Sequence, residues 1–288
     1  MQLIAIIDIG SHSTKLEIFK VKGHKKVKRL YKDNDYLYLF QDINSFSFIS
    51  QEMMDKLVLL LLKYKRTIAF YECNVVKVIA TSALRDASNS RSVISYLKLK
   101  TNLTVEVISG DQEAKFSQLA FLSLKIKSPF STIFDLGGGS TEVSLFSDKE
   151  PIAFHSFNIG VIRCIKEKDD SEWNKLKTFI EKNKKEQSIC IGLGSSIRRF
   201  AQLIKQQKHK KGYIIKQESV AIFNDILIRK GTDYIEKKYN LYGLKVEYLK
   251  TVIALLNFFY NSLNINKIYY YPISIRKGAA LSLLKNKS

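Results

Sequence analysis

One pattern occurs twice in this chain: an apolar strand that ends in Asp-x-Gly. It reads IDIGS at residues 7–11 and FDLGG at residues 134–138. Each copy opens a series of β-rich and amphipathic segments in the order β-β-β-α-β-α. Such alternation of strands and helices is typical of an α/β sheet with crossover connections. We therefore predict an α/β protein made of two similar lobes that face one central cleft.

The second copy begins after a polar segment, Lys-Ser-Pro at residues 127–129. A chain of 288 residues is long enough for two domains of ordinary size. We predict an N-terminal lobe over residues 1–126 and a C-terminal lobe over residues 127–288. The last helix, at about residues 275–286, could instead pack back on the first lobe.

The spacing of hydrophobic residues along the chain predicts the individual helices and strands. It predicts helices at residues 51–70, 92–99, 111–124, 173–184, 195–204, 218–228 and 246–263. Runs rich in β-formers predict strands at residues 3–8, 16–21, 27–31, 75–80, 104–108, 132–136, 142–146, 152–157, 189–193 and 267–271.

The composition excludes several classes of protein. Hydrophobic residues make up 45% of the chain and charged residues 26%, so the chain can bury a core and is not disordered. Its longest apolar runs are far shorter than the roughly 20 residues of a membrane span. Residues 3–7 resemble a buried strand rather than a signal peptide. We therefore expect a cytoplasmic protein that does not use a membrane.

The net charge of +20 constrains the partners. A field of that sign attracts polyanions such as nucleic acid, anionic lipid or phosphate chains. The alternative is a solvated, lysine-rich surface without a partner. Three widely spaced cysteines and four scattered histidines indicate reduced thiols and no zinc site.

The glycine run after the second Asp-x-Gly strand is the most informative segment. Gly137, Gly138 and Gly139 carry no Cβ, so their N–H groups can close around an anion. Hydroxyl donors follow at Ser140 and Thr141. At the two ends stand Asp135 and Glu142, hard oxygen ligands that suit Mg²⁺. The alternative is a glycine-rich turn that only connects two strands.

The matching loop of the first copy starts at Asp8. It continues with Gly10, Ser11, His12 and Ser13, in which hydroxyls replace the run of glycines. Together the two loops predict a phosphate-binding site, with Asp8, Asp135 and Glu142 available to a metal ion.

Two further charged residues follow predicted strands. Glu113 stands in the first turn of the helix after strand 104–108, where it either faces a ligand or caps the helix. Arg85 follows strand 75–80, where it either clamps phosphate oxygens or pairs with Asp86.

Four segments together resemble the exopolyphosphatase and guanosine-pentaphosphate phosphohydrolase (Ppx/GppA) family, within the actin-like ATPase superfamily of two ribonuclease-H-like lobes. They read IDIGSHS at residues 7–13, ATSALRDASN at 80–89, ISGDQEA at 108–114 and DLGGGSTE at 135–142. Weaker matches are NIGV at 158–161, GLGSSIR at 192–198 and RKG at 276–278. The Ser-Gly-x-x-Glu-Ala segment separates the chain from sugar kinases and heat-shock ATPases of that superfamily.

The resemblance implies a role for each predicted site residue. Glu113 would be the general base for a water that attacks the terminal phosphoryl group. Asp135 and Glu142 would hold Mg²⁺ or orient that water, and Arg85 would bind the terminal phosphate. Asp8 and the two loops would complete the phosphate cradle.

The chain also departs from the family pattern. His12 stands where the family usually has asparagine, and Lys277 replaces the usual glutamate. The helix at 246–263 lacks the family's Arg-Ala-Asp followed by a glycine. These changes bear on how the rest of a long substrate or a nucleotide is held.

The leading interpretation is a Mg²⁺-dependent exopolyphosphatase that releases terminal orthophosphate from inorganic polyphosphate. Hydrolysis of the guanosine pentaphosphate 5′-γ-phosphate is the alternative, because both substrates present the same terminal group. A non-catalytic polyphosphate or nucleotide sensor is a further alternative. Nucleic acid is the less expected partner, and a homodimer is left open.

Overall fold

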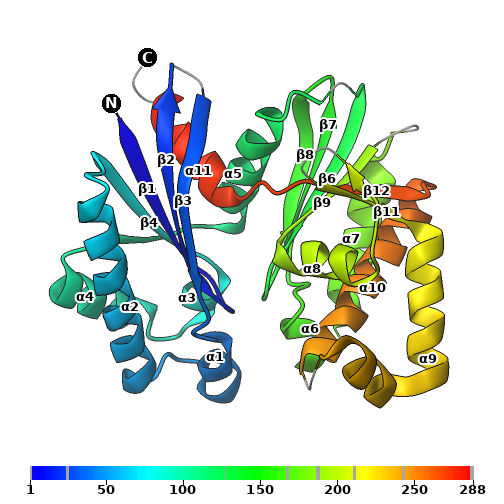
Figure 1. The fold of residues 1–288 in the computed structure, drawn as a ribbon, viewed down its shortest axis with the longest axis horizontal. Helices are drawn as coiled ribbons and strands as arrows, with labels where there is room; N and C mark the ends of the chain where they lie inside the picture. The colour runs from blue at the N-terminus through cyan, green and yellow to red at the C-terminus, as the bar shows by residue number, and fades with distance from the viewer. Residues whose placement is uncertain are drawn as a thin grey trace. The chain divides into compact units, whose positions relative to one another are not determined.

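The chain divides into two compact units (Figure 1). A computed structural model describes residues 2–23, 26–126, 128–166, 169–185, 189–209, 212–241 and 244–285. Met1–Leu124 and Ser274–Ser288 form the first unit, and Lys125–Ile273 forms the second. The boundary thus lies two residues before the predicted one, and the last helix belongs to the first unit. Residue 286, the last one predicted for that helix, lies outside the described residues.

The first unit contains a five-stranded sheet in the order β3-β2-β1-β4-β5. Its strands are β1 (Leu3–Ile9), β2 (Thr14–Lys22), β3 (Lys26–Asp35), β4 (Val75–Ala80) and β5 (Val105–Val107). Strand β2 runs antiparallel to β1 and β3, while β4 and β5 run parallel to β1. The carboxyl ends of β1, β4 and β5 therefore lie at one edge of the sheet.

Helices cover both faces of this sheet (Figure 1). They are α1 (Phe40–Phe46), α2 (Gln51–Phe70), α3 (Ser82–Asp86), α4 (Ser90–Thr101), α5 (Gly110–Leu122) and α11 (Ile275–Lys285). Because side chains alternate along a strand, Ile7 packs with α2 and α4 residues, and Ile6 packs with α5 and α11 residues. At Gly278 a Cβ would lie 1.8 Å from the Phe116 carbonyl oxygen, so only glycine lets α11 approach α5 this closely.

The second unit repeats this topology. Its seven-stranded sheet has the order β10-β11-β12-β9-β6-β7-β8. The strands are β6 (Phe130–Leu136), β7 (Thr141–Ser147), β8 (Glu150–Phe157), β9 (Ile189–Leu193), β10 (Lys208–His209), β11 (Gly212–Lys216) and β12 (Lys267–Tyr270). Strands β6, β9 and β12 run parallel, and β7 pairs antiparallel with β6 and β8. Read from β8 to β12, the order matches that of the first sheet from β3 to β5.

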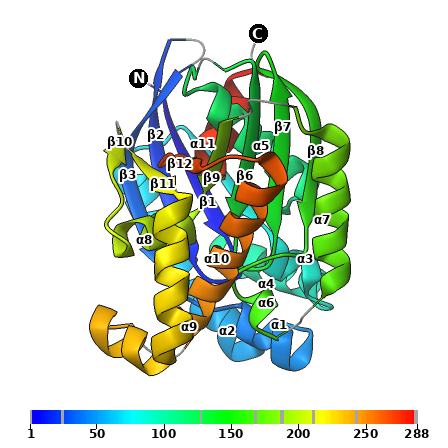
Figure 2. The ribbon, with the colours of Figure 1, turned by 90° about the vertical axis from the view of Figure 1, so that its right-hand side faces the viewer.

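The helices of the second unit are α6 (Arg163–Lys166), α7 (Asp170–Asn183), α8 (Ser195–Leu203), α9 (Gln217–Tyr239) and α10 (Leu244–Leu263). Helices α9 and α10 lie side by side (Figure 2). Phe259 of α10 stacks on Phe134 of β6, with ring centroids 4.4 Å apart. No helix of the described residues has the length and apolar character that a membrane crossing requires.

The repeated β-β-β-α-β-α order confirms the predicted fold class, an α/β protein with two ribonuclease-H-like lobes. The periodicity did not predict α1 and α3 of the first unit, nor α6, β10, β11 and the part of α9 beyond residue 228 in the second. Helix α9 continues through a kink at Gly231, whose φ of 77° is left-handed.

Candidate active site

The predicted phosphate loops are two copies of the same turn. In the first, the Gly10 N–H donates to the Ser13 carbonyl at 3.2 Å, and in the second the Gly137 N–H donates to the Ser140 carbonyl at 2.9 Å. A Cβ at either glycine would lie 3.1 Å from the carbonyl oxygen that closes the turn. The repeat seen in the sequence is thus a repeat of backbone geometry.

Each turn is followed by a buried hydroxyl residue. Thr14 opens β2 opposite Ile9, and Thr141 opens β7 opposite Leu136. Both threonines are fully buried, and Ser13 is buried as well. The loops are therefore fixed at both ends, which suits a preorganised anion site.

The carbonyl oxygens of the glycine run are directed toward the segment that follows β8. Val161 and Ile162 donate their N–H groups to the Gly137 and Gly138 carbonyls at 3.1 and 2.9 Å. The Arg163 Nε donates to the Gly139 carbonyl at 2.8 Å. These bonds turn the negative ends of the peptide dipoles toward residues 161–163, which makes the other side of the loop suitable for an anion.

Gly160 makes this arrangement feasible. A Cβ there would lie 2.3 Å from the Gly138 carbonyl oxygen, so any larger residue would displace the loop. The sequence analysis found only a weak family match at residues 158–161, and it did not identify Gly160 or Arg163 as site residues. A glycine in an otherwise apolar Asn-Ile-Gly-Val segment was the available signal.

The two acidic residues of the second unit lie opposite each other. Asp135 of β6 pairs in register with Glu142 of β7. Ser156 of β8 donates to Glu142 Oε1 at 2.8 Å. At Gly194, where φ is 100°, a Cβ would lie 3.3 Å from Asp135 Oδ1, so the loop after β9 also approaches this carboxylate. The structure thus brings Asp135 and Glu142 to the same end of one hairpin.

Arg85 and Glu113 are brought together in the first unit. Arg85 Nη1 lies 3.4 Å from Glu113 Oε2 and 3.0 Å from the Ile108 carbonyl oxygen. The helix α5 is capped by Ser109 and Gln112 in a reciprocal capping box, so Glu113 is not the side chain that caps it. Glu113 is nevertheless only 8% exposed. A buried carboxylate beside a guanidinium fits a functional pair better than a solvated helix end.

The segment that carries Arg85 also contacts the first loop. The Ser11 and Ser82 hydroxyls are hydrogen-bonded at 2.5 Å, and the Thr81 N–H donates to the Ile9 carbonyl at 3.1 Å. Arg85, Glu113 and the loop therefore all follow the carboxyl ends of parallel strands, where ligands bind in open α/β sheets.

Asp8 has a partner that the sequence analysis did not identify. The buried Arg276 of α11 donates through Nη1 to Asp8 Oδ2 at 2.5 Å and through Nη2 to Glu17 Oε1 at 3.2 Å. Burial disfavours the charged guanidinium, but the charges of Glu17 and Asp8 and their hydrogen bonds outweigh it and raise the pKa of Arg276. The available signal was an arginine among the small and apolar residues of the last helix, such as Ile275 and Ala279.

His12 lies among aromatic rings. Its ring meets Tyr36 and Tyr38 edge-on, with centroids 5.2 and 4.7 Å apart, and is roughly parallel to Phe40 at 6.4 Å. The first loop thus has an aromatic border that the second loop, with glycine at the equivalent position, does not repeat.

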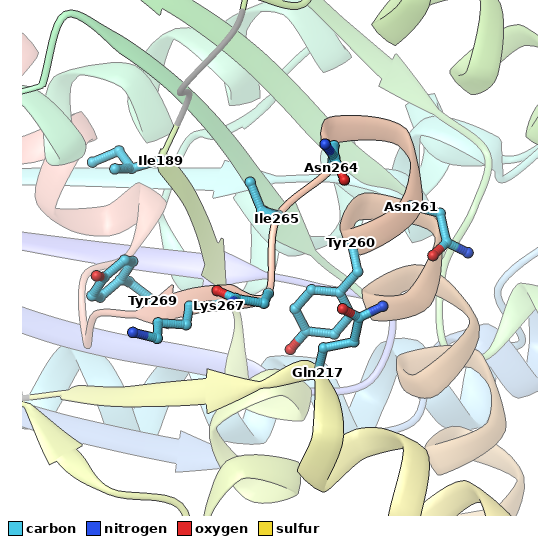
Figure 3. A pocket seen from close by; sticks show the side chains of 9 residues that line it. Ile189, Gln217, Tyr260, Asn261, Asn264, Ile265, Lys267 and Tyr269 are labelled. Carbon is cyan, nitrogen blue, oxygen red and sulfur yellow. The ribbon is translucent and has the colours of Figure 1, made fainter.

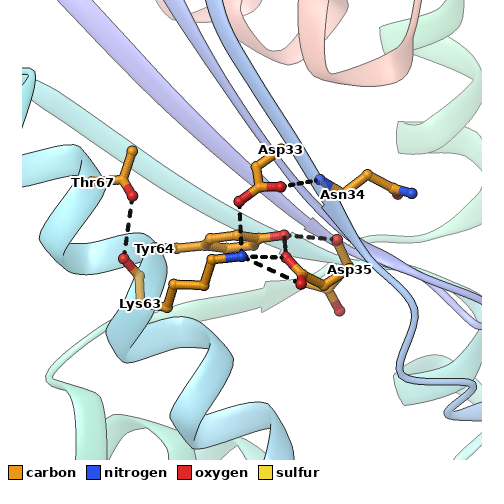
Figure 4. Close-up of polar contacts among 7 residues, drawn as sticks. Asp33, Asn34, Asp35, Lys63, Tyr64 and Thr67 are labelled. Atoms are coloured by element: carbon orange, nitrogen blue, oxygen red, sulfur yellow. Dashed lines mark hydrogen bonds and ion pairs between the residues drawn. The ribbon is translucent and has the colours of Figure 1, made fainter.

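A network beside the first loop is structural (Figure 4). Lys63 of α2 lies 3.0 Å from both Asp33 and Asp35 of β3, and the Tyr64 hydroxyl contacts Asp35 and the Thr14 carbonyl at 2.9 Å each. Burial first, and then the neighbouring Asp35, raise the pKa of Tyr64. The network joins α2 to the end of β3 and to Thr14, the first residue of β2.

One polar hollow of about 620 Å³ lies elsewhere in the second unit (Figure 3). Its lining includes Gln217, Tyr260, Asn261 and Lys267. It lies where β9 and β12 begin, whereas the Gly137–Thr141 loop follows the end of the parallel strand β6. The hollow is therefore at the opposite edge of the sheet from the candidate site.

Comparison with known proteins agrees with these motifs. A family model described as the Ppx/GppA phosphatase family matches residues 17–287. The bifunctional 3-dehydroquinate synthase/phosphatase of Fusobacterium nucleatum is 34% identical over 191 residues, which is 63% of this chain and 28% of that protein. Exopolyphosphatase 1 of Mycobacterium tuberculosis is 27% identical over 168 residues, 57% of this chain and 48% of that protein. The matches thus span less than half the length of these two relatives.

A solved structure supports the fold over the whole chain. The crystal structure of the Aquifex aeolicus member of the Ppx/GppA family has a TM-score of 0.81 at 21% identity, with 100% of this chain and 99% of that chain covered. The family match, the duplicated turn and the paired Arg85 and Glu113 agree, and the chain belongs to the Ppx/GppA phosphatase family.

Proposed function

We propose that this chain is an exopolyphosphatase, a hydrolase of phosphoric anhydride bonds that releases orthophosphate from the end of inorganic polyphosphate. The observation that carries the proposal is the duplicated turn. In each copy the N–H of the first glycine, Gly10 or Gly137, donates to the carbonyl oxygen three residues later. Each turn follows the first strand of its unit, β1 or β6, where backbone N–H groups can bind phosphate oxygens. The +20 net charge would favour the approach of a polyanionic substrate.

Glu113 is proposed as the general base. Its carboxylate would accept a proton from a water whose oxygen bonds to the terminal phosphorus, while the bridging P–O bond breaks and the shortened chain leaves. Arg85, at 3.4 Å from Glu113 Oε2, would bind the terminal phosphate and hold the carboxylate in place. Phosphoryl transfer depends mainly on such positioning and charge neutralisation.

Mg²⁺ is proposed as the cofactor, held by Asp135 and Glu142. Magnesium usually takes one or two protein carboxylates and completes its shell with water and substrate phosphates, which these two residues satisfy. Within the described ranges no group of three or more His, Cys, Asp or Glu side chains is placed to hold a metal ion. Bound there, Mg²⁺ would neutralise charge on the transferred phosphoryl group.

Asp8 is proposed to act from the phosphate cradle rather than as a free metal ligand. Its carboxylate already has a buried guanidinium partner in Arg276. A cation at Asp8 would have to compete with that ion pair. The proposed role of Asp8 is therefore to fix the strand end from which the Gly10–Ser13 turn starts.

Hydrolysis of guanosine pentaphosphate is a second candidate, favoured by one observation. Tyr36 and Tyr38 stand exposed beside the first loop, and a polyphosphate chain has no flat apolar group for them to contact. The terminal phosphoryl chemistry would be the same for both substrates.

The direct test measures orthophosphate released from polyphosphate, with Mg²⁺ and with a chelator. The proposal predicts steady release that requires the divalent ion. Tight binding of polyphosphate without release under any divalent ion would contradict it and would favour the non-catalytic sensor.

A further inference from the structure

Two tyrosines are exposed in the short connection between β3 and α1. Tyr36 is 40% exposed and Tyr38 is 37% exposed. Main-chain hydrogen bonds fasten this connection to the first loop, because the Tyr38 N–H donates to the His12 carbonyl at 3.3 Å and the Phe40 N–H donates to the Ser11 carbonyl at 3.0 Å. The rings are therefore held beside the predicted phosphate turn.

The geometry of the rings is that of a platform. The Tyr36 and Tyr38 rings are stacked, with centroids 6.0 Å apart and planes inclined by 27°. His12 contacts both rings edge-on, at interplanar angles of 77° and 86°. The ring of the buried Phe40 meets Tyr38 edge-on, with ring centroids 6.3 Å apart. Edge-to-face contacts of this kind fix ring orientation.

The backbone at Tyr38 adds a second observation. Its φ is 57°, in the left-handed region that aromatic residues seldom adopt. Such conformations persist only where the surrounding structure holds them, and they cluster at ligand sites.

We infer that Tyr36 and Tyr38 form a stacking platform for the planar base of a nucleotide whose phosphates occupy the Gly10–Ser13 turn. The inference rests on the proposed function for the identity of that turn. Tyrosine suits the task because it offers a large flat surface with few rotatable bonds to immobilise. Base–aromatic stacking tolerates any base, so the ligand class is a nucleoside polyphosphate. Inorganic polyphosphate would bind the turn and leave the platform unused.

The experiment compares GTP, ATP and tripolyphosphate as ligands by calorimetry. All variants carry Glu113→Gln, so that turnover does not consume the ligand. Tyr36→Leu and Tyr38→Leu remove the flat ring, while Tyr36→Phe and Tyr38→Phe retain it. Phe46→Leu is the matched control, because Phe46 is 57% exposed on α1 and contacts Phe48 instead of the loop.

The platform predicts that each leucine variant raises the Kd for GTP and ATP about 5- to 150-fold, the equivalent of 1–3 kcal/mol per stacked base. The Kd for tripolyphosphate should stay within about twofold, and the phenylalanine variants and Phe46→Leu should resemble the parent. Unchanged nucleotide affinity in the leucine variants would overturn the inference. An equal loss for nucleotides and tripolyphosphate would overturn it too, because the rings would then only shape the turn.

A second measurement needs no leucine variant. Magnetisation transfer by NMR between tyrosine ring protons and the protons of the bound base is expected with both rings intact, and its absence would also contradict the platform. The two proposals can fail separately. Nucleotide binding that depends on the tyrosine rings, without phosphate release, would refute the hydrolase alone. Phosphate release without ring-dependent nucleotide binding would refute the platform alone.

Discussion

Arg276 is a buried charged residue of the first unit. It is buried against two carboxylates, Asp8 and Glu17, which come from neighbouring strands. Ser274 also donates to Glu17, at 3.2 Å. Removing one member of such a group leaves a buried charge without compensation, which costs far more than the intact group contributes.

Replacement of this guanidinium should therefore destabilise the protein strongly. We expect Arg276→Met to lower the free energy of unfolding by about 3–5 kcal/mol, measured by urea denaturation. Arg229→Met is the control, because Arg229 forms an exposed pair with Asp225 along α9. Equal losses of unfolding free energy in the two variants would show that the buried ion pairs of Arg276 do not contribute this stability.

The ion pairs of Arg276 with Asp8 and Glu17 also predict how the stability of the protein depends on pH. Burial acts to raise the pKa of Glu17, but Arg276, Arg29 and Lys32 outweigh it, and the net pKa lies below the ordinary 4.5. A lowered folded-state pKa gives stability that is present above 4.5 and is lost as the pH falls through the folded-state value. The stability difference between wild type and Glu17→Gln should thus be full at neutral pH and shrink below pH 4.5. A difference that stays constant down to pH 3 would contradict this assignment (urea titrations at each pH).

At this scale the sequence identified the residue types of the site but not their partners. Asp8, Arg85 and Glu113 each end or follow a strand, so their placement at one sheet edge could be predicted. The Arg276–Asp8 pair could not, because 268 residues separate its members and only the return of the last helix brings them together.

Among the elements, the two turns and the segment after β8 define the candidate site. The turns recur because β1 and β6 hold the same position in the strand order that the two sheets share. The second turn additionally depends on Gly160, since only a residue without a side chain fits against the Gly138 carbonyl.

Gly160→Ala tests that dependence. The added methyl group would lie 2.3 Å from the Gly138 carbonyl oxygen, so the loop must move. We expect phosphate release to fall by about 10²-fold, the usual effect of an ångström-scale displacement, with the circular dichroism spectrum retained. Gly23→Asn in the β2–β3 turn is the control, because nothing lies within 4 Å of a Cβ there and asparagine tolerates its φ of 62°. Wild-type rates in Gly160→Ala would show that the loop does not bind the substrate.

Elements with strong local signals were predicted to the residue. Helix α2 spans Gln51–Phe70 as its periodicity indicates, with Ser50 as N-cap, and β4 and β9 have their predicted bounds. Strands β10 and β11 were missed because of their own sequences: β10 has two residues, and β11, which reads GYIIK, does not alternate apolar and polar residues.

For the molecule as a whole, duplication and charge are the organising features. The two units share one strand order, and the final helix completes the first unit after the chain has passed through the second. The duplication was visible in the sequence as two Asp-x-Gly strands. The return of the helix was left open there, because an apolar helix can pack on either lobe.

The +20 charge should act over the whole surface. Salt screens exposed charges beyond a Debye length of about 10 Å at 0.1 M. We therefore expect the KM for long polyphosphate to rise steeply between 50 and 200 mM KCl while kcat changes little, and steady-state kinetics at several salt concentrations would check this. A KM independent of salt would indicate that the lysines are only a solvated surface.

The central claim, that Glu113 deprotonates the attacking water, is tested most directly by single-turnover phosphate release from polyphosphate. Glu113→Gln retains the shape of the side chain and removes the base, so the rate should fall about 10²- to 10⁴-fold with polyphosphate affinity preserved. Glu106→Gln, which alters the ion pair between Glu106 of β5 and Lys77 of β4, should react like the wild type. Equal rates for Glu113→Gln and wild type would contradict the account.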